Sequence, residues 1–159
     1  MGPIARNIAR LRPDRRVTLR WVTTDIALLD AGRRAPWRRL RRDGVDAALD
    51  LRTAAEGGGL DEFPSSEFVL RWCPVSDGGA PAFHDLIEVT DWLSAQVARG
   101  MRVAVACREG RGRSALLVCA TLMRLGYSLE GAYRLVRRAQ PSIALSDRQI
   151  RVLEELNRS

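Results

Sequence analysis

A cysteine, two glycines, an arginine and a serine stand at fixed spacing near the middle of the chain. Cys107 is followed six positions later by Arg113 and then by Ser114, with Gly110 and Gly112 between them. An ionised thiol is a nucleophile, and a planar guanidinium grips two oxygens of a tetrahedral anion. Glycines let the backbone approach that anion without Cβ clashes. The segment therefore predicts a loop that holds a phosphoryl group against a nucleophilic sulfur.

The hydrophobic pattern places this loop between a strand and a helix. Residues 101–106 read as a short buried strand, and residues 114–125 carry apolar side chains at helical spacing. The free N–H groups and the dipole of a helix N-terminus both favour negative charge. We therefore expect Cys107 to be largely a thiolate at neutral pH, with phosphate-binding N–H groups around it.

The segment from Cys107 to Ser114 resembles the C-x5-R-[ST] signature loop of the cysteine-dependent protein tyrosine and dual-specificity phosphatases. Residues 72–81 resemble the general-acid segment of the compact, atypical dual-specificity members, and Asp77 lies thirty residues before the cysteine, as their general acid typically does. Residues 21–25 and 46–52 resemble the opening core strands of such domains. The resemblance covers most of the chain from about Val17 onward.

The resemblance implies a phosphatase that hydrolyses phosphate monoesters through a cysteinyl-phosphate intermediate, with no cofactor and no metal. Cys107 is then the nucleophile, Asp77 the general acid and later the base, and Ser114 a donor to the sulfur. Arg113 binds the phosphoryl group, and Gln149 is expected to orient the hydrolytic water. The rest of the phosphate-binding loop is Arg108, Glu109, Gly110, Arg111 and Gly112.

Other titratable residues have simpler interpretations. Asp50 competes with Asp77 as the acid, but it reads as a strand-end residue paired with a backbone group or an arginine. His84, the single histidine, reads as a partly exposed residue at a helix start. Cys119 reads as a core residue, and Cys73 as a buried structural thiol, with redox pairing to Cys107 as an alternative.

Two further functional classes remain open. Cys107 to Gly110 also fits a rhodanese-like sulfurtransferase, although that loop would place its closing basic residue where this chain has Gly112, so loop length favours the phosphatase. Ala106 stands where the phosphatases usually carry a histidine. This difference removes a hydrogen-bonding neighbour of the thiolate and leaves a phosphate-binding pseudophosphatase as another alternative.

The compact chain, without a recognition insert, resembles the atypical dual-specificity phosphatases. This resemblance implies a protein substrate carrying phosphotyrosine, and also phosphoserine or phosphothreonine. The alternative is a phosphoinositide or another polyphosphorylated small molecule. Arg108 and Arg111 suit a substrate with several phosphates, whereas Glu109 opposes one.

Composition indicates one globular domain. The chain has 159 residues, 46% of them hydrophobic, and we divide it into a basic N-terminal arm, 1–16, and a catalytic domain, 17–159. The net charge of +7 is concentrated in residues 1–20 and 33–42, without the interleaved aromatic residues that base stacking needs, so a nucleic-acid partner is disfavoured. We find no membrane span and no secretory signal, and an odd number of cysteines indicates a reducing compartment. We expect a cytoplasmic monomer.

The expected fold is α/β, a tyrosine-phosphatase-like single domain with a central mixed, mostly parallel sheet flanked by helices. Glycines 57–59 predict a flexible loop. The expected strands are 17–22, 26–29, 45–49, 68–72 and 102–106, and the expected helices are 36–42, 83–98, 114–125, 129–139 and 146–156.

Overall fold

A five-stranded mixed sheet forms the centre of the computed structural model, which describes residues 18–35, 37–59 and 68–159. The strands lie in the order β1-β2-β5-β3-β4, and only β1 runs antiparallel to its neighbour. Their bounds are Thr18–Trp21 (β1), Ile26–Asp30 (β2), Ala47–Asp50 (β3), Val69–Trp72 (β4) and Val103–Cys107 (β5). The predicted arm, 1–16, lies outside the described residues.

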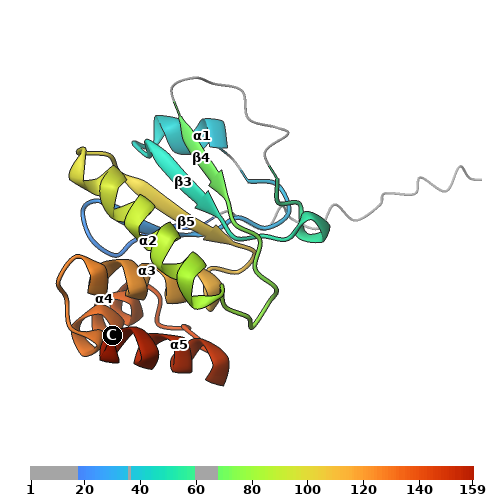
Figure 1. Ribbon diagram of the computed structural model, residues 1–159. Helices are drawn as coiled ribbons and strands as arrows, with labels where there is room; N and C mark the ends of the chain where they lie inside the picture. Colours follow the sequence, from blue (N-terminus) through green and yellow to red (C-terminus); the bar gives the residue numbers. More distant parts are fainter. Residues whose placement is uncertain (1–17, 36, 60–67) are drawn as a thin grey trace, which may run out of the picture.

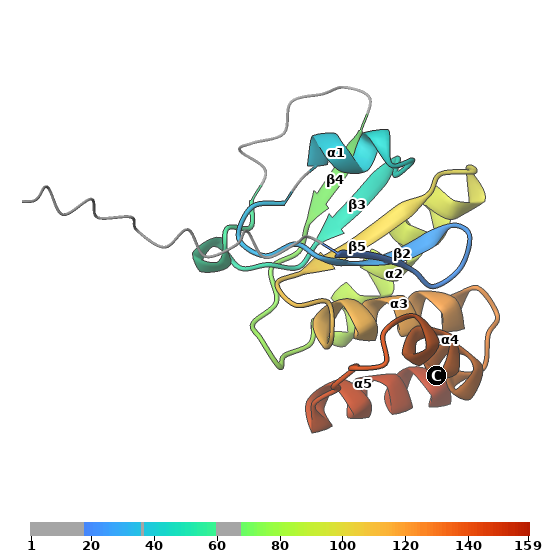
Figure 2. The same cartoon turned by 180° about the vertical axis from the view of Figure 1, so that it is seen from behind.

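Helices cover both faces of this sheet (Figure 1). The short helix α1, Trp37–Arg42, lies on one face, and the long helices lie on the other, as the reverse view in Figure 2 also shows. Their bounds are Phe83–Ala98 (α2), Arg113–Arg124 (α3), Leu129–Ala139 (α4) and Asp147–Arg158 (α5). None of the helices within the described residues is long and apolar enough to cross a membrane.

The centre of the molecule is built on β5 and α3. All five residues of β5 are buried, because helices cover the sheet on both faces and a central parallel strand must be apolar on both sides. Helix α3 is buried from Arg113 to Leu122, because it lies against the sheet on one side and against α2, α4 and α5 on the other. The loop that joins β5 to α3 is thus fixed at both of its ends.

The strand register brings the carboxyl ends of β2, β3 and β5 to one edge of the sheet. Asp30 pairs with Cys107, and Asp50 pairs with Ala106. In open α/β sheets this edge is where ligands bind. The predicted fold class is confirmed, and every predicted strand and helix is present with ends within two residues of the prediction.

The glycines at 57 and 58 have a packing role that the sequence did not predict. A short 3-10 helix, η1 (Ala54–Glu56), precedes them, and Gly57 ends it in the left-handed conformation at φ 93°. A Cβ atom on Gly57 would come within 2.2 Å of the Arg33 carbonyl oxygen, and one on Gly58 within 2.1 Å of the Arg52 carbonyl oxygen. Gly57 and Gly58 therefore allow their backbone to pack closely against the segments that follow β2 and β3.

Candidate active site

Five of the eight residues of the signature loop line one pocket of about 190 Å³ at the carboxyl edge of the sheet; Arg108, Gly110 and Ser114 do not. Its lining is Asp77, Gly78, Cys107, Glu109, Arg111, Gly112, Arg113, Ala144, Ser146 and Gln149. Arg108 lies on the neighbouring side of the loop, where a second hollow of about 360 Å³ also includes Asp77 and Arg113. The loop, the predicted acid and the start of α5 thus converge on one site.

Cys107 ends β5 and is only 2% exposed. The backbone N–H of Gly110 donates to its Sγ at 3.1 Å. Gly110 has φ +66° and packs against the end of β2, where a Cβ would lie 3.3 Å from the Asp30 nitrogen. This position therefore needs glycine both for its backbone angle and for space.

Ser114 behaves differently from the prediction. Its Oγ is buried and has no hydrogen-bond partner among the described residues. The predicted donation to the Cys107 sulfur is therefore not made in this structure, in which the Gly110 N–H donates to the sulfur instead. A buried hydroxyl without a partner is energetically costly, so the structure leaves this donor available to an acceptor in the site.

The Arg113 guanidinium is held by the protein along one edge. Its Nη1 donates to Glu56 Oε1 at 2.6 Å and to the Val75 carbonyl at 2.7 Å, and its Nη2 donates to Glu56 Oε2 at 2.7 Å. Two of its five N–H groups, on Nε and Nη2, have no partner among the described residues. Those two lie on the side edge of the guanidinium, so they form a fork for two oxygens of one anion.

Glu56 is a site residue that the sequence analysis did not identify. Its pair with Arg113 lowers the pKa of the Glu56 carboxyl from 4.5 to about 2, chiefly through the Arg113 hydrogen bonds. The pKa of Arg113 is raised, first by those hydrogen bonds and then by the charges of Cys107, Glu56 and Asp77. The Thr53-x-x-Glu56 capping box was the available sequence signal, because it marks a short helical turn that fixes the glutamate.

Asp77 lies in a tight turn above the phosphate loop. The Gly79 N–H donates to the Ser76 carbonyl at 2.8 Å, and Gly78 has φ +72°. Such a turn needs glycine at its third position and leaves the side chain of the second position exposed. The Asp77 carboxyl is exposed and lines the pocket that contains Cys107.

The N-terminus of α5 holds this turn in place. Ser146 Oγ donates to the Gly78 carbonyl at 2.7 Å, and Gln149 Nε2 donates to the Gly79 carbonyl at 2.9 Å. Gln149 Oε1 accepts from the Ser146 backbone N–H, so the amide is oriented. Gln149 is 1% exposed and lines the pocket, and its second amide N–H has no partner among the described residues.

Asp50 is a structural residue, in agreement with the interpretation from the sequence. Its carboxylate accepts two hydrogen bonds from the Arg52 side chain, at 2.9 and 3.0 Å, and both residues are buried. Arg52 also donates to the carbonyl oxygens of Gly32 and Arg33. The pair therefore fastens the segments after β2 and β3 to each other beneath η1, and so helps to position Glu56.

The remaining cysteines and the histidine lie outside the site. Cys73 follows β4, two strands away from Cys107 in the sheet, a separation of about 10 Å that exceeds the reach of a disulfide. Cys73 is therefore not placed to pair with Cys107. Burial raises the pKa of the Cys119 thiol to about 12, as expected for a core residue. His84 is exposed beside Asp85.

Two other features of the described residues bear on the chemistry. No group of three or more histidine, cysteine or acidic side chains there is arranged to hold a metal ion. A larger groove of about 490 Å³ lies between α4 and α5 and meets the pocket at Ala144, but it is lined mainly by apolar side chains and has no nucleophile. Residue chemistry therefore selects the smaller pocket as the reactive one.

Comparison with known proteins agrees with this geometry. The model of the dual specificity phosphatase catalytic domain matches residues 40–159. The chain belongs to the dual specificity phosphatase family. It is a cysteine-dependent phosphatase, and this assignment decides against the sulfurtransferase alternative. A search of curated protein sequences found no match.

Solved structures share the fold over most of the chain. Tk-PTP in its active form is 28% identical with a TM-score of 0.77, and the match covers 88% of this chain and 96% of that one. Human DUSP28 is 24% identical with a TM-score of 0.74, covering 88% and 93%. PTPMT1 in complex with PI(5)P is 22% identical with a TM-score of 0.78, covering 88% and 94%.

Proposed function

We propose that this phosphatase acts on phosphorylated proteins, with Cys107 as nucleophile, Arg113 as phosphoryl ligand and Asp77 as general acid. One observation carries the proposal: Cys107, the unpaired edge of Arg113 and the Asp77 carboxyl share one small pocket. The pocket is open to solvent at Asp77, so a side chain projecting from a protein surface can enter it.

In the first step the Cys107 thiolate attacks phosphorus, a sulfur–phosphorus bond forms and the ester bond breaks. Asp77 gives its proton to the departing oxygen, which otherwise would leave as an alkoxide. Arg113 and the loop N–H groups balance the charge that collects on the equatorial oxygens. The product is a cysteinyl-phosphate and a free hydroxyl on the protein substrate.

In the second step a water molecule attacks the phosphorus of the cysteinyl-phosphate. Asp77, which is now ionised, takes a proton from this water. We assign the free amide N–H of Gln149 to the attacking water and the unpartnered Ser114 hydroxyl to the departing sulfur. A hydrogen bond from Ser114 stabilises the thiolate as the sulfur–phosphorus bond breaks. Inorganic phosphate then leaves and the enzyme is regenerated.

A phosphoinositide or another polyphosphorylated substrate is the second candidate. Arg108 and Arg111 are both exposed. Arg111 lines the reactive pocket itself, and Arg108 lines the hollow beside it. Extra phosphates on a ring would meet these cations. PTPMT1, which shares the fold, was crystallised with PI(5)P.

A substrate panel separates the two candidates. We expect kcat/KM to be higher for phosphotyrosine, phosphoserine and phosphothreonine peptides than for soluble inositol phosphates. An Arg108→Ala, Arg111→Ala variant serves as the matched probe, because it should leave peptide turnover within a few-fold and reduce inositol-phosphate turnover much more. Faster turnover of inositol phosphates than of any phosphopeptide would contradict the protein-substrate proposal.

A further inference from the structure

The net charge of the described residues comes from one segment. Residues 31–42 contain six arginines and no acidic residue, whereas the rest of the described chain contains fifteen arginines and fifteen acidic residues. The described residues therefore carry a net charge of +6, all of it on twelve consecutive positions. A composition rich in arginine throughout would not produce this segregation.

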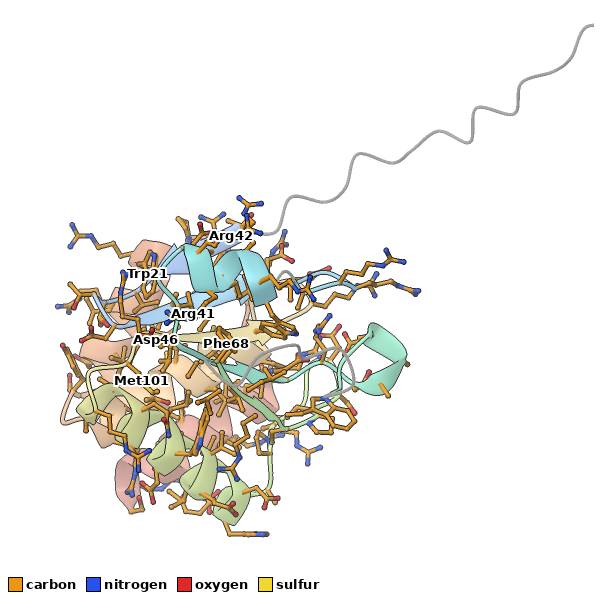
Figure 3. All side chains as sticks on the ribbon, turned by 90° about the horizontal axis from the view of Figure 1, so that it is seen from above. Trp21, Arg41, Arg42, Asp46, Phe68 and Met101 are labelled. Atoms are coloured by element: carbon orange, nitrogen blue, oxygen red, sulfur yellow. The ribbon has the colours of Figure 1, made fainter. Side chains whose placement is uncertain are left out.

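Helix α1 turns those arginines outward. Trp37 and Leu40 are buried against the sheet, and Trp37 packs against Phe68. Between the buried positions the helix carries only arginines, at 38, 39, 41 and 42, and all four are exposed. Figure 3 looks onto this side of the molecule, with Arg41 and Arg42 labelled at α1.

Several of these arginines have no carboxylate partner. Arg39 pairs with Asp43 at 3.7 Å, and Arg41 pairs with Asp46 at 2.9 Å. The other four have no ion-pair partner among the residues that the structure describes, and we call them the basic surface: Arg33, Arg34, Arg38 and Arg42. Exposed like charges at this density repel one another, so an anionic partner relieves a real electrostatic cost.

The basic surface begins beside the phosphate loop. The Ala31 N–H donates to the Cys107 carbonyl at 3.0 Å, and the Gly32 N–H donates to the Arg108 carbonyl at 3.2 Å. Arg33 and Arg34 follow directly and are exposed. A partner bound here therefore lies next to the edge of the sheet at which the reactive pocket opens.

We propose that the basic surface docks the enzyme on membranes that contain anionic lipids. Clusters of four to eight basic residues bind such membranes, each arginine near the surface contributing roughly a fivefold factor in affinity.

A nucleic-acid partner fits the same charge less well. Trp37 and Phe68, the two rings packed beneath α1, are 7% and 5% exposed, so neither is available for base stacking. Helix α1 has only six residues and packs on one face of the sheet, so it is too short to enter a major groove.

The test measures binding of the full chain to vesicles. In the first variant the four arginines of the basic surface become Gln (R33Q, R34Q, R38Q and R42Q). The matched control makes the same charge change on the opposite side of the molecule, at four exposed arginines of α4 and α5 (R134Q, R137Q, R138Q and R151Q). Turnover of an aryl phosphate, which needs none of these eight residues, reports that each variant is folded.

The parent and the control are expected to sediment with phosphatidylcholine vesicles that contain about 30 mol% phosphatidylserine, and not with phosphatidylcholine alone. The basic-surface variant should bind at least about tenfold more weakly, and raising the salt should release the parent because screening shortens the reach of the charges. Equal losses in the two variants, no vesicle binding by the parent, or binding to single-stranded RNA in place of vesicles would overturn the proposal.

Discussion

The two edges of the Arg113 guanidinium have different partners in the proposed mechanism. One edge is bound by Glu56 and the Val75 carbonyl, and the other is available to the phosphoryl group. A lysine ammonium has neither the planar shape nor the five donors that both tasks require. We expect Arg113→Lys to lower kcat/KM for an aryl phosphate by at least about a hundredfold and to weaken binding of vanadate, an oxyanion probe of the loop. Parent-like binding of vanadate would contradict this division of the side chain.

Glu56 holds one edge of the Arg113 guanidinium through two hydrogen bonds, so we propose that it is a positioning residue. Glu56→Gln keeps the shape but replaces two hydrogen bonds between opposite charges by at most one from the guanidinium to a neutral amide oxygen. We expect kcat/KM to fall by about ten- to a hundredfold, in line with about 1.5–3 kcal/mol for hydrogen bonds to charged groups. Steady-state kinetics on an aryl phosphate measure this change.

The matched control for Glu56 is Glu130→Gln, at an exposed position in the first turn of α4. It removes the same charge far from Arg113 and should leave kcat/KM unchanged. If the two substitutions lowered kcat/KM equally, the loss would come from the change in net charge and not from the position of Arg113.

At the scale of elements, the start of α5 fixes the turn that carries Asp77. Without the hydrogen bonds from Ser146 and Gln149, the acid should spend less time over the leaving group. We therefore expect the double variant Ser146→Ala, Gln149→Ala to slow hydrolysis of alkyl phosphates much more than that of aryl phosphates, whose leaving groups need little protonation. Asp77→Asn should show the same dependence on the leaving group, more strongly.

Comparison of the two variants gives this prediction its control. If the double variant slowed aryl and alkyl phosphates equally while Asp77→Asn discriminated between them, the contacts from α5 would not act through Asp77. If the Asp77→Asn variant hydrolysed both aryl and alkyl phosphates at the rate of the parent, Asp77 would not be the general acid.

The extent of the elements followed from local patterns. Apolar periodicity and the N-caps at Ser128 and Ser146 depend only on residues close together in the sequence. Helices 83–98 and 129–139 were therefore predicted with their observed ends. The signature loop was equally local, since Cys107, Arg113 and the glycines lie within seven residues of one another. Its place at the end of a parallel strand followed from the alternation of strands and helices.

The contacts that support the loop did not follow from the sequence. Glu56 and Arg113 are 57 positions apart, and the hydrogen bond from Gln149 to Gly79 spans 70. Such pairs are set by strand order and register, which no local pattern encodes. The packing role of the glycines at 57 and 58 was missed for a similar reason, because the carbonyl groups that they pack against belong to Arg33 and Arg52.

At the scale of the whole molecule, the Glu56–Arg113 pair links stability to pH. The folded state holds the pKa of Glu56 near 2, whereas its ordinary value is 4.5. As the pH falls, Glu56 therefore takes up a proton in the unfolded chain before it does so in the folded protein. The contribution of the Glu56–Arg113 pair to the free energy of unfolding is complete above pH 4.5 and is lost as the pH falls from 4.5 towards 2.

Urea unfolding across that interval tests the linkage. The free energy of unfolding of the parent should fall more steeply than that of Glu56→Gln, by about 1–2 kcal/mol in total after allowance for partial solvent exposure of the pair. Parallel curves for the two proteins would mean that the carboxyl is not held charged by Arg113.

The central claim is that the Cys107 sulfur is the nucleophile of a metal-independent hydrolysis. The direct measurement is turnover of an aryl phosphate by the parent and by Cys107→Ser, with a reductant and a chelator present, between pH 5 and 8. We predict turnover by the parent and none by the variant, while the variant still binds vanadate. Equal turnover by both proteins, or none by the parent, would contradict the account.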